Sequence, residues 1–163
     1  IKKWVDPKNH QIHSSFYTFN ALGSPHHAAR LENCTIDPGT ILVPKTTRPL
    51  IIESVGGILV PLTMNFLSID LFKQWGGKWV VVSRHYIGSI NHTLLTLEAL
   101  QRRGIFISGI IFNGEANPDS ERAILEISKA PFLARLLPEA NLNSQTIQKY
   151  AKQWHPYLRK LLH

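Results

Sequence analysis

Three consecutive segments between residues 78 and 104 constrain this 163-residue chain more than any other part of it. The apolar run Lys78–Val82 has the pattern of a fully buried parallel strand. The small-residue turn Gly88–Asn91 follows, and after it comes a helix that ends at Gly104 and carries apolar residues at helical spacing: Leu94, Leu95, Leu97 and Leu100. A strand, a tight turn and a helix in this order are typical of an α/β fold.

The turn Gly88–Asn91 has the features of an anion-binding site. The backbone N–H groups in the first turn of a helix have no partner within the helix, and the helix dipole is positive at this end. The other interpretation, an ordinary connection between a strand and a helix, stays open from the turn alone.

Further strands and helices are predicted on both sides of this unit. Strands are expected at Gly104–Phe112, which ends at Asn113-Gly114, and at Pro131–Leu137. One helix is expected to begin with Ser24 as its cap and Pro25 at its first position. Two more are expected, one over Ser68–Trp75 with Ser68 as the cap and one over Asp119–Ser128. The last is expected to begin at Asn143 or Ser144 and to run to the C-terminus, and Pro156 should kink or interrupt it.

A second apolar run, Pro49–Glu53, predicts another buried parallel strand, and this one ends in a carboxylate. Ligands of open α/β sheets bind at the carboxyl ends of the strands. In a phosphoryl-transfer site a carboxylate there can hold Mg²⁺ directly or through water. The alternative is a glutamate at a strand end that faces solvent.

Composition narrows the class of protein. The chain has eighteen Lys and Arg against eleven Asp and Glu, but these basic residues are scattered and form no nucleic-acid-binding motif, so we expect no nucleic acid partner. No apolar run is long enough to span a membrane, which predicts a cytoplasmic protein without a membrane partner. The single Cys34 excludes an intrachain disulfide and a cysteine-based zinc site. A chain of this length predicts one α/β domain over residues 1–163.

Four blocks of sequence, in this order, resemble the dethiobiotin synthetase family. They are YTFNALGSPH (17–26), IESVGGILVPL (52–62), GSINHTLLTLEAL (88–100) and GIIFN (109–113). The resemblance runs from about Phe16 to Pro138. It implies a P-loop NTPase-like fold, with a mostly parallel sheet and helices on both faces.

The resemblance also implies an ATP- and Mg²⁺-dependent ligase of biotin biosynthesis that acts as a homodimer with shared active sites. CO₂ carboxylates 7,8-diaminopelargonate to a carbamate, ATP phosphorylates the carbamate, and the second amine closes the ring as phosphate leaves. By resemblance Glu53 is the metal ligand, and Asn113 reads the adenine, although Asn113-Gly114 could be only a turn. The implied nucleotide-binding residues are Glu53, Ser54, Val55, Gly56, Asn113, Gly114, Pro138, Glu139 and Ala140. The implied substrate-binding residues are Gly88, Ser89, Ile90, Asn91, Ser24 and Pro25, the last two of which could equally form only a helix cap.

The sequence departs from the family in two places. Ser54 and Val55 replace the usual Gly-Ala after the glutamate, and they add side chains where a backbone can approach nucleotide. No segment matches G-x-x-x-x-G-K-[ST], the loop that holds ATP phosphates. We expect that loop and the catalytic lysines to precede Ile1, so that this chain carries no catalytic residue and is inactive alone. The alternatives are a non-catalytic, dimer-forming remnant and a partition-type P-loop ATPase that binds nucleic acid or a membrane.

Overall fold

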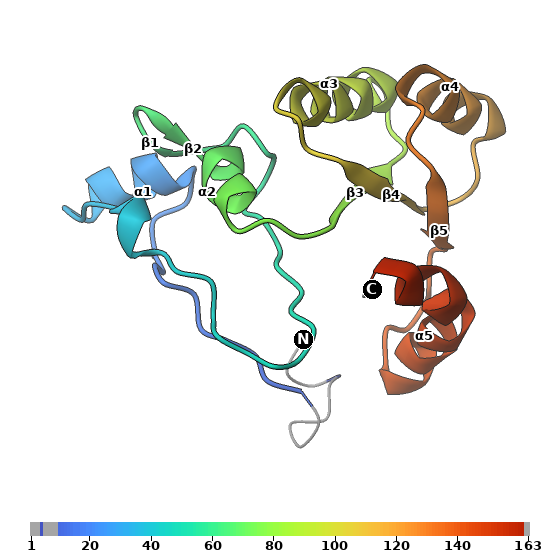
Figure 1. Ribbon diagram of the computed structural model, residues 1–163, viewed down its shortest axis with the longest axis horizontal. Helices are drawn as coiled ribbons and strands as arrows, with labels where there is room; N and C mark the ends of the chain where they lie inside the picture. The colour runs from blue at the N-terminus through green and yellow to red at the C-terminus, as the bar shows by residue number, and fades with distance from the viewer. Residues whose placement is uncertain (1–3, 5–9, 162–163) are drawn as a thin grey trace. The chain divides into compact units, whose positions relative to one another are not determined.

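The computed structural model describes Trp4 and residues 10–161, and the chain divides into two compact units (Figure 1). One unit comprises residues 11–76. The other comprises residues 77–161 together with Trp4 and His10. Whether both belong to one domain stays a prediction, and each unit is described by itself.

The unit of residues 11–76 is built from short elements. They are α1 (Pro25–Leu31), the 3₁₀ turn η1 (Pro38–Thr40), β1 (Pro61–Thr63), β2 (Phe66–Leu67) and α2 (Ser68–Gln74), with β1 and β2 antiparallel. Pro25 occupies the first turn of α1, where its fixed φ and missing N–H carry no penalty. A small core holds this unit together: Ala28, Ala29, Ile36, Leu62, Ile69 and Leu71.

Both predicted serine caps differ in detail from the expectation. Ser24 is the N-cap residue of α1, but its side chain accepts no hydrogen bond from the helix backbone; its hydroxyl lies 3.0 Å from Nδ1 of His26. Ser68 is wrong as a cap, because α2 already starts there and Leu67 is the N-cap. The hydroxyl of Ser68 instead donates to the carbonyl of Ile58 at 2.8 Å. Asp70 accepts the N–H of Leu67 at 3.1 Å, which fixes the start of α2.

The predicted strand at residues 49–53 is wrong. The segment has no strand conformation, Ile51 is 95% exposed and Ile52 is 45% exposed. A parallel strand is stable when neighbouring strands take up its N–H and C=O groups and helices cover its faces. Among the residues that the structure describes, no strand pairs with this segment. If it were buried as a strand, its backbone N–H and C=O groups would lose their hydrogen bonds to water without gaining others.

The unit of residues 77–161 contains a parallel sheet flanked by helices, which confirms the α/β class. Its elements are β3 (Trp79–Arg84), α3 (Ser89–Arg102), β4 (Ile107–Asn113), α4 (Pro118–Ser128), β5 (Phe132–Leu136), α5 (Ser144–Leu158) and the 3₁₀ turn η2 (Arg159–Leu161). The strand order is β3-β4-β5, with both pairs parallel. In Figure 1, α3 and α4 lie side by side on one side of the sheet, and α5 packs against β5. The fully buried residues come from these elements: Leu97, Leu100, Ile110, Phe112 and Ile124.

Two predictions for this unit need correction. The strand at residues 78–82 is parallel as predicted but not fully buried, since Val82 is 65% exposed. Only β4 pairs with β3 among the described strands, so β3 is an edge strand there. Pro156 does not interrupt α5, which continues to Leu158 before the 3₁₀ turn begins. The cost of a proline inside a helix is one missing hydrogen bond and a local clash, and here only two residues of α5 follow it.

Candidate functional site

The carboxyl ends of the three parallel strands meet at one edge of the sheet. Arg84, the last residue of β3, is in register with Asn113 of β4, and Asn113 is in register with Leu136 of β5. The segments that follow the strands therefore leave the sheet side by side. Ligands of open α/β sheets bind at such an edge.

The turn between β3 and α3 leaves the start of α3 open. Gly88 is the N-cap residue with φ +93°, a conformation that glycine adopts without strain and other residues rarely adopt. Having no side chain, Gly88 cannot cap the first-turn N–H groups of α3. Ser83 anchors the strand beside this turn, because its buried hydroxyl is hydrogen bonded to that of Thr93 at 2.8 Å.

An open pocket lies over this turn and reaches the first turn of α4. Asn117 is the N-cap of α4, and its side-chain oxygen accepts the N–H of Ser120 at 3.2 Å. Two helix N-termini thus border one pocket, and both carry partial positive charge. The lining residues are His85, Tyr86, Ile87, Gly88, Ser89, Ile90, Asn91, Leu94, Asn117 and Ser120.

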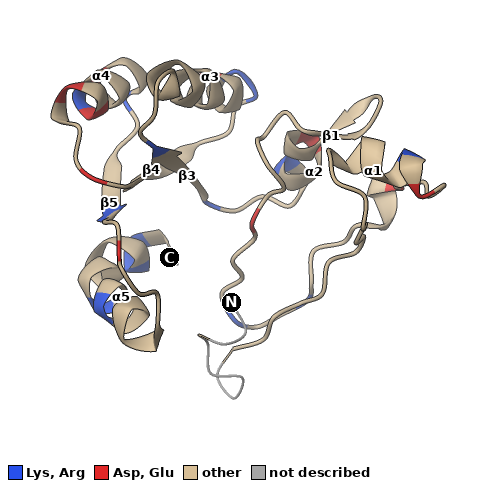
Figure 2. Cartoon of the chain, turned by 180° about the vertical axis from the view of Figure 1, so that it is seen from behind, with Lys and Arg blue, Asp and Glu red and all other residues tan. Residues whose placement is uncertain are grey.

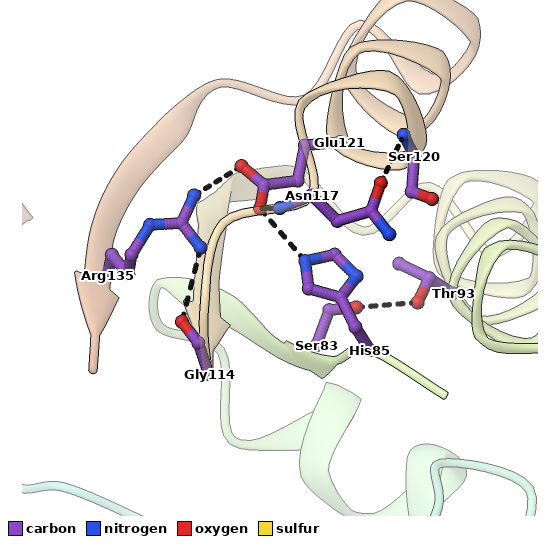
Figure 3. Close-up of polar contacts among 8 residues, drawn as sticks. All are labelled: Ser83, His85, Thr93, Gly114, Asn117, Ser120, Glu121 and Arg135. Carbon is purple, nitrogen blue, oxygen red and sulfur yellow. Dashed lines mark hydrogen bonds and ion pairs between the residues drawn. The ribbon is translucent and has the colours of Figure 1, made fainter. Parts of the chain in front are cut away.

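A buried carboxylate, that of Glu121, contacts two residues that line the pocket, His85 and Asn117 (Figure 3). Glu121 of α4 is 8% exposed and forms an ion pair with Arg135 of β5. Its other oxygen lies 2.9 Å from Nε2 of His85 and accepts the N–H of Asn117 at 2.9 Å. Burial raises the pKa of Glu121, but the hydrogen bonds from Arg135, Asn117 and His85 outweigh burial and hold the pKa below its usual value. Glu121 is therefore ionised at neutral pH.

The predicted base-reading residue Asn113 ends β4 beside this cluster. Gly114 continues the ladder, because its N–H donates to the carbonyl of Leu136 at 2.8 Å. Its carbonyl accepts a hydrogen bond from Nη1 of Arg135 at 3.3 Å. Gly114 has φ +129°, so the chain turns away from the sheet there, as an Asn-Gly pair would favour. The contact of Asn113 with adenine stays a prediction.

The predicted nucleotide-binding segment Pro138–Ala140 is attached to α5. One oxygen of Glu139 accepts hydrogen bonds from the hydroxyl of Tyr150 at 2.6 Å and from Nζ of Lys149 at 2.9 Å. These two bonds, in that order, lower the pKa of Glu139. The Tyr150 oxygen also accepts the N–H of Leu137 at 3.2 Å, so α5 fixes the chain on both sides of Pro138.

Glu53 and its loop belong to the other unit. The Glu53 side chain is exposed, and Gly56 has φ +62°. The hydroxyl of Ser54 is buried and has no hydrogen-bond partner among the described residues, which leaves a polar atom available in this loop. The described residues hold no group of three His, Cys, Asp or Glu suited to a metal. Since Mg²⁺ commonly takes only one or two carboxylates and completes its shell with water and phosphate, a single exposed glutamate fits it.

The comparisons with known proteins agree on one family. The model of an AAA domain matches residues 1–146. An ATP-dependent dethiobiotin synthetase of Chlamydia abortus is 44% identical over 88% of this chain and 69% of its own length. The enzyme of Chlamydia pneumoniae is 40% identical over 87% of this chain and 64% of its own length, and that of Christiangramia forsetii is 36% identical over 97% and 76%.

The chain belongs to the dethiobiotin synthetase family. The predicted resemblance is confirmed, and the chain spans about two thirds of the length of the relatives from the two Chlamydia species.

The predicted dethiobiotin synthetase residues are distributed over both units. The residues after β3, β4 and β5 lie at one edge of one sheet: Gly88–Asn91, Asn113-Gly114 and Pro138–Ala140. Ser24, Pro25 and Glu53–Gly56 lie in residues 11–76. The roles of all these residues stay predictions.

The sequence reasoning missed Glu121, Arg135 and Asn117. The contacts of Glu121 with Arg135 and His85 join residues that are 14 and 36 positions apart, which no local pattern reveals, whereas its contact with Asn117 spans only four positions. One signal was available: Glu121 lies three residues before Ile124 and seven before Ser128, on the buried face of α4. A charged residue in register with a buried helix face indicates a buried partner.

Proposed function

We propose that the protein is a dethiobiotin synthetase, which uses ATP and Mg²⁺ to carboxylate 7,8-diaminopelargonate and close the ureido ring, giving ADP and phosphate. The observation that carries this proposal is the 44% identity to the Chlamydia abortus enzyme over most of the chain. The open pocket at the start of α3 supports it, because an anionic substrate needs unpaired N–H groups.

Within the proposal, the chain binds and orients reactants. The substrate carboxylate rests on the Gly88–Asn91 turn, where the N–H groups of Ile90 and Asn91 are the donors, since that of Ser89 donates to the carbonyl of Tyr86. Asn113 offers a donor and an acceptor to the adenine edge. Holding each reactant in a fixed geometry lowers the entropic part of the barrier.

Glu53 is the residue proposed to hold Mg²⁺. The bound metal would neutralise charge on the phosphoryl group that is transferred. No other metal ligand is proposed within this chain.

The proposal includes a cytoplasmic homodimer. No helix among the described residues is long and apolar enough to cross a membrane. Figure 2 shows the basic residues spread over many elements rather than gathered on one, which gives no support to a nucleic-acid-binding surface.

The substitution Glu53→Gln tests the metal assignment in the complete protein that the gene encodes. The amide keeps the shape of the side chain and removes the charge that attracts Mg²⁺, so turnover should fall at least about tenfold, as expected for a lost metal contact in phosphoryl transfer. The measurement is dethiobiotin formed from ATP, bicarbonate and diaminopelargonate as Mg²⁺ is varied.

Glu126→Gln is the matched control, because Glu126 is an exposed glutamate on α4 and should leave turnover unchanged. If Glu53→Gln has the same turnover and Mg²⁺ dependence as the parent, Glu53 does not hold the metal and is a glutamate that faces solvent. A parent protein that makes no dethiobiotin would overturn the proposed function itself.

A further inference from the structure

The Glu121 carboxylate contacts segments that follow two strands and a residue of the third. His85 directly follows β3, Arg135 lies in β5, and Arg135 in turn binds the carbonyl of Gly114 directly after β4 (Figure 3). We propose that Glu121, acting with Arg135, is a positioning residue that holds the Gly88–Asn91 turn and the Asn113-Gly114 strand end in one arrangement. This inference rests on the proposed function for its catalytic meaning.

Two sets of contacts, which we call arms, extend from Glu121. The first arm connects Glu121 through His85 to the Gly88–Asn91 turn. The His85 ring stacks on Phe112 with 5.5 Å between centroids, and its Nε2 lies 2.9 Å from Glu121. Its Nδ1 is buried and has no partner among the described residues. Glu121 is therefore the polar contact that orients the ring, and His85 lies only three residues before Gly88.

The second arm runs from Glu121 through Arg135 to Gly114. Arg135 spans the gap with two nitrogens, one on Glu121 and one on the Gly114 carbonyl. Its guanidinium also lies 5.8 Å from the centroid of Phe112, the ring on which His85 stacks. Both arms thus meet the same buried phenylalanine from different strands.

Both carboxylate oxygens of Glu121 are needed for this arrangement. One accepts from His85 and from the N–H of Asn117, and the other accepts from Arg135. In Glu121→Gln one oxygen becomes an NH₂ donor, which faces either the Arg135 guanidinium or the N–H of Asn117. With the NH₂ toward Arg135, the contact with Arg135 is lost. With the NH₂ toward Asn117, two donors face each other, and Nε2 of His85 can accept from the amide only if the ring proton moves to the buried, partnerless Nδ1, so the contact with His85 is weakened.

A purely structural ion pair would predict something different. Loss of such a pair lowers the stability of the whole unit and affects all its amides alike. A positioning pair affects the two segments selectively. The amides of Ser89 and Gly114 report on those segments, because they donate to Tyr86 and Leu136, and the amide of Ile110 reports on the centre of the sheet.

Hydrogen exchange on this chain, without any substrate, is the first test. In Glu121→Gln the exchange rates at Ser89 and Gly114 should rise at least about tenfold relative to the change at Ile110, as local opening becomes easier than global opening. Glu98→Gln is the matched control, because Glu98 pairs with Arg102 on the exposed side of α3. An equal change at all three amides would overturn the proposal.

Kinetics of the complete encoded protein is the second test. Glu121→Gln should raise KM for both diaminopelargonate and ATP roughly tenfold, because the two segments proposed to bind these reactants are no longer held in position. Arg135→Lys loses the two-pronged contact and should raise mainly KM for ATP, whereas His85→Leu should raise mainly KM for diaminopelargonate. Equal effects of the latter two variants on both constants would overturn the two-arm arrangement. If the parent protein is inactive, the proposed function is wrong, and the hydrogen-exchange result alone tests whether Glu121 positions the two segments.

Discussion

At the scale of single residues, the charge state of Glu121 depends on the fold. Its pKa is raised by burial and lowered by a larger sum of hydrogen bonds from Arg135, Asn117 and His85. The folded protein therefore prefers the ionised carboxylate. By linkage this preference stabilises the fold above the pKa of the unfolded chain, near 4.5, and the stabilisation is lost as the pH falls through the lower folded value.

We expect Glu121→Gln to remove this pH dependence. At pH 7 the variant should be less stable than the parent by roughly 1–3 kcal/mol, the cost of leaving a buried polar partner unsatisfied. The difference should shrink as the pH falls below about 4.5, where Glu121 of the unfolded parent takes up a proton, and the part due to the charge should be lost below the lower pKa of the folded parent. Chemical denaturation at several pH values measures it. A difference that stays constant down to acid pH would show that the Glu121 charge contributes nothing.

At the scale of elements, the contact between β4 and β5 depends on a glycine. A Cβ added at Gly109 would lie 2.4 Å from Cγ of Leu133 and 2.8 Å from the carbonyl oxygen of Pro131. Both neighbours belong to the segment that pairs with β4, and the clash with a backbone oxygen cannot be relieved by turning a side chain. The spacing of the two strands therefore requires glycine at this position.

Gly109→Ala should destabilise the unit by about 1–3 kcal/mol or more, as overpacking of a well-packed core does. Its neighbour Ser108 supplies the control, because the Ser108 hydroxyl is buried without a partner among the described residues. Ser108→Ala removes that hydroxyl and should be neutral or stabilising. Thermal unfolding of both variants compares them. A Gly109→Ala protein as stable as the parent would mean that the strands can separate freely.

Sequence patterns predicted the elements whose stability is local. The helix α3 has its leucine stripe and ends near Gly104, α4 starts one residue before the predicted Asp119, and α5 has Asn143 as its cap. Each signal lies within a few residues of the element it defines, so no distant partner was needed. The parallel pairing of β3 with β4 followed in the same way from a strand, a helix and a strand in succession.

The failures are those that depend on distant contacts. Residues 49–53 are as apolar as a strand, but whether they form one depends on a neighbour that pairs with them. Burial of Val82 likewise depends on what covers β3. In the candidate site, the turn at Gly88 was predictable from its composition, whereas the Glu121 contacts required the spatial arrangement of β3, α4 and β5.

At the scale of the whole molecule, the proposed dimer makes a prediction about how sites are shared. By resemblance, the Gly88–Asn91 turn of one subunit serves the active site that contains Glu53 of the other. A two-fold dimer would then contain two equivalent sites at an isologous interface. Each site would depend on residues from two chains.

Mixing two inactive variants tests this arrangement. We expect Glu53→Gln and Asn91→Ala, each made in the complete encoded protein, to be poorly active. After unfolding and refolding together in equal amounts, about half the dimers should be mixed, and each mixed dimer has one intact site. Activity should recover to about a quarter of the parent. Activity no higher than the average of the two variants would place both residues in the same subunit's site.

The order of the strands in the sheet has a consequence for how the protein is made. In the unit of residues 77–161, β3, β4 and β5 are neighbours in space in the same order in which they follow one another along the chain. A ribosome therefore releases each strand next to the edge that it will join, and no strand has to be inserted between two that are already paired. The sheet can grow by one strand and one helix at a time during translation, and the segments to close at each step are residues 85–106 and residues 114–131.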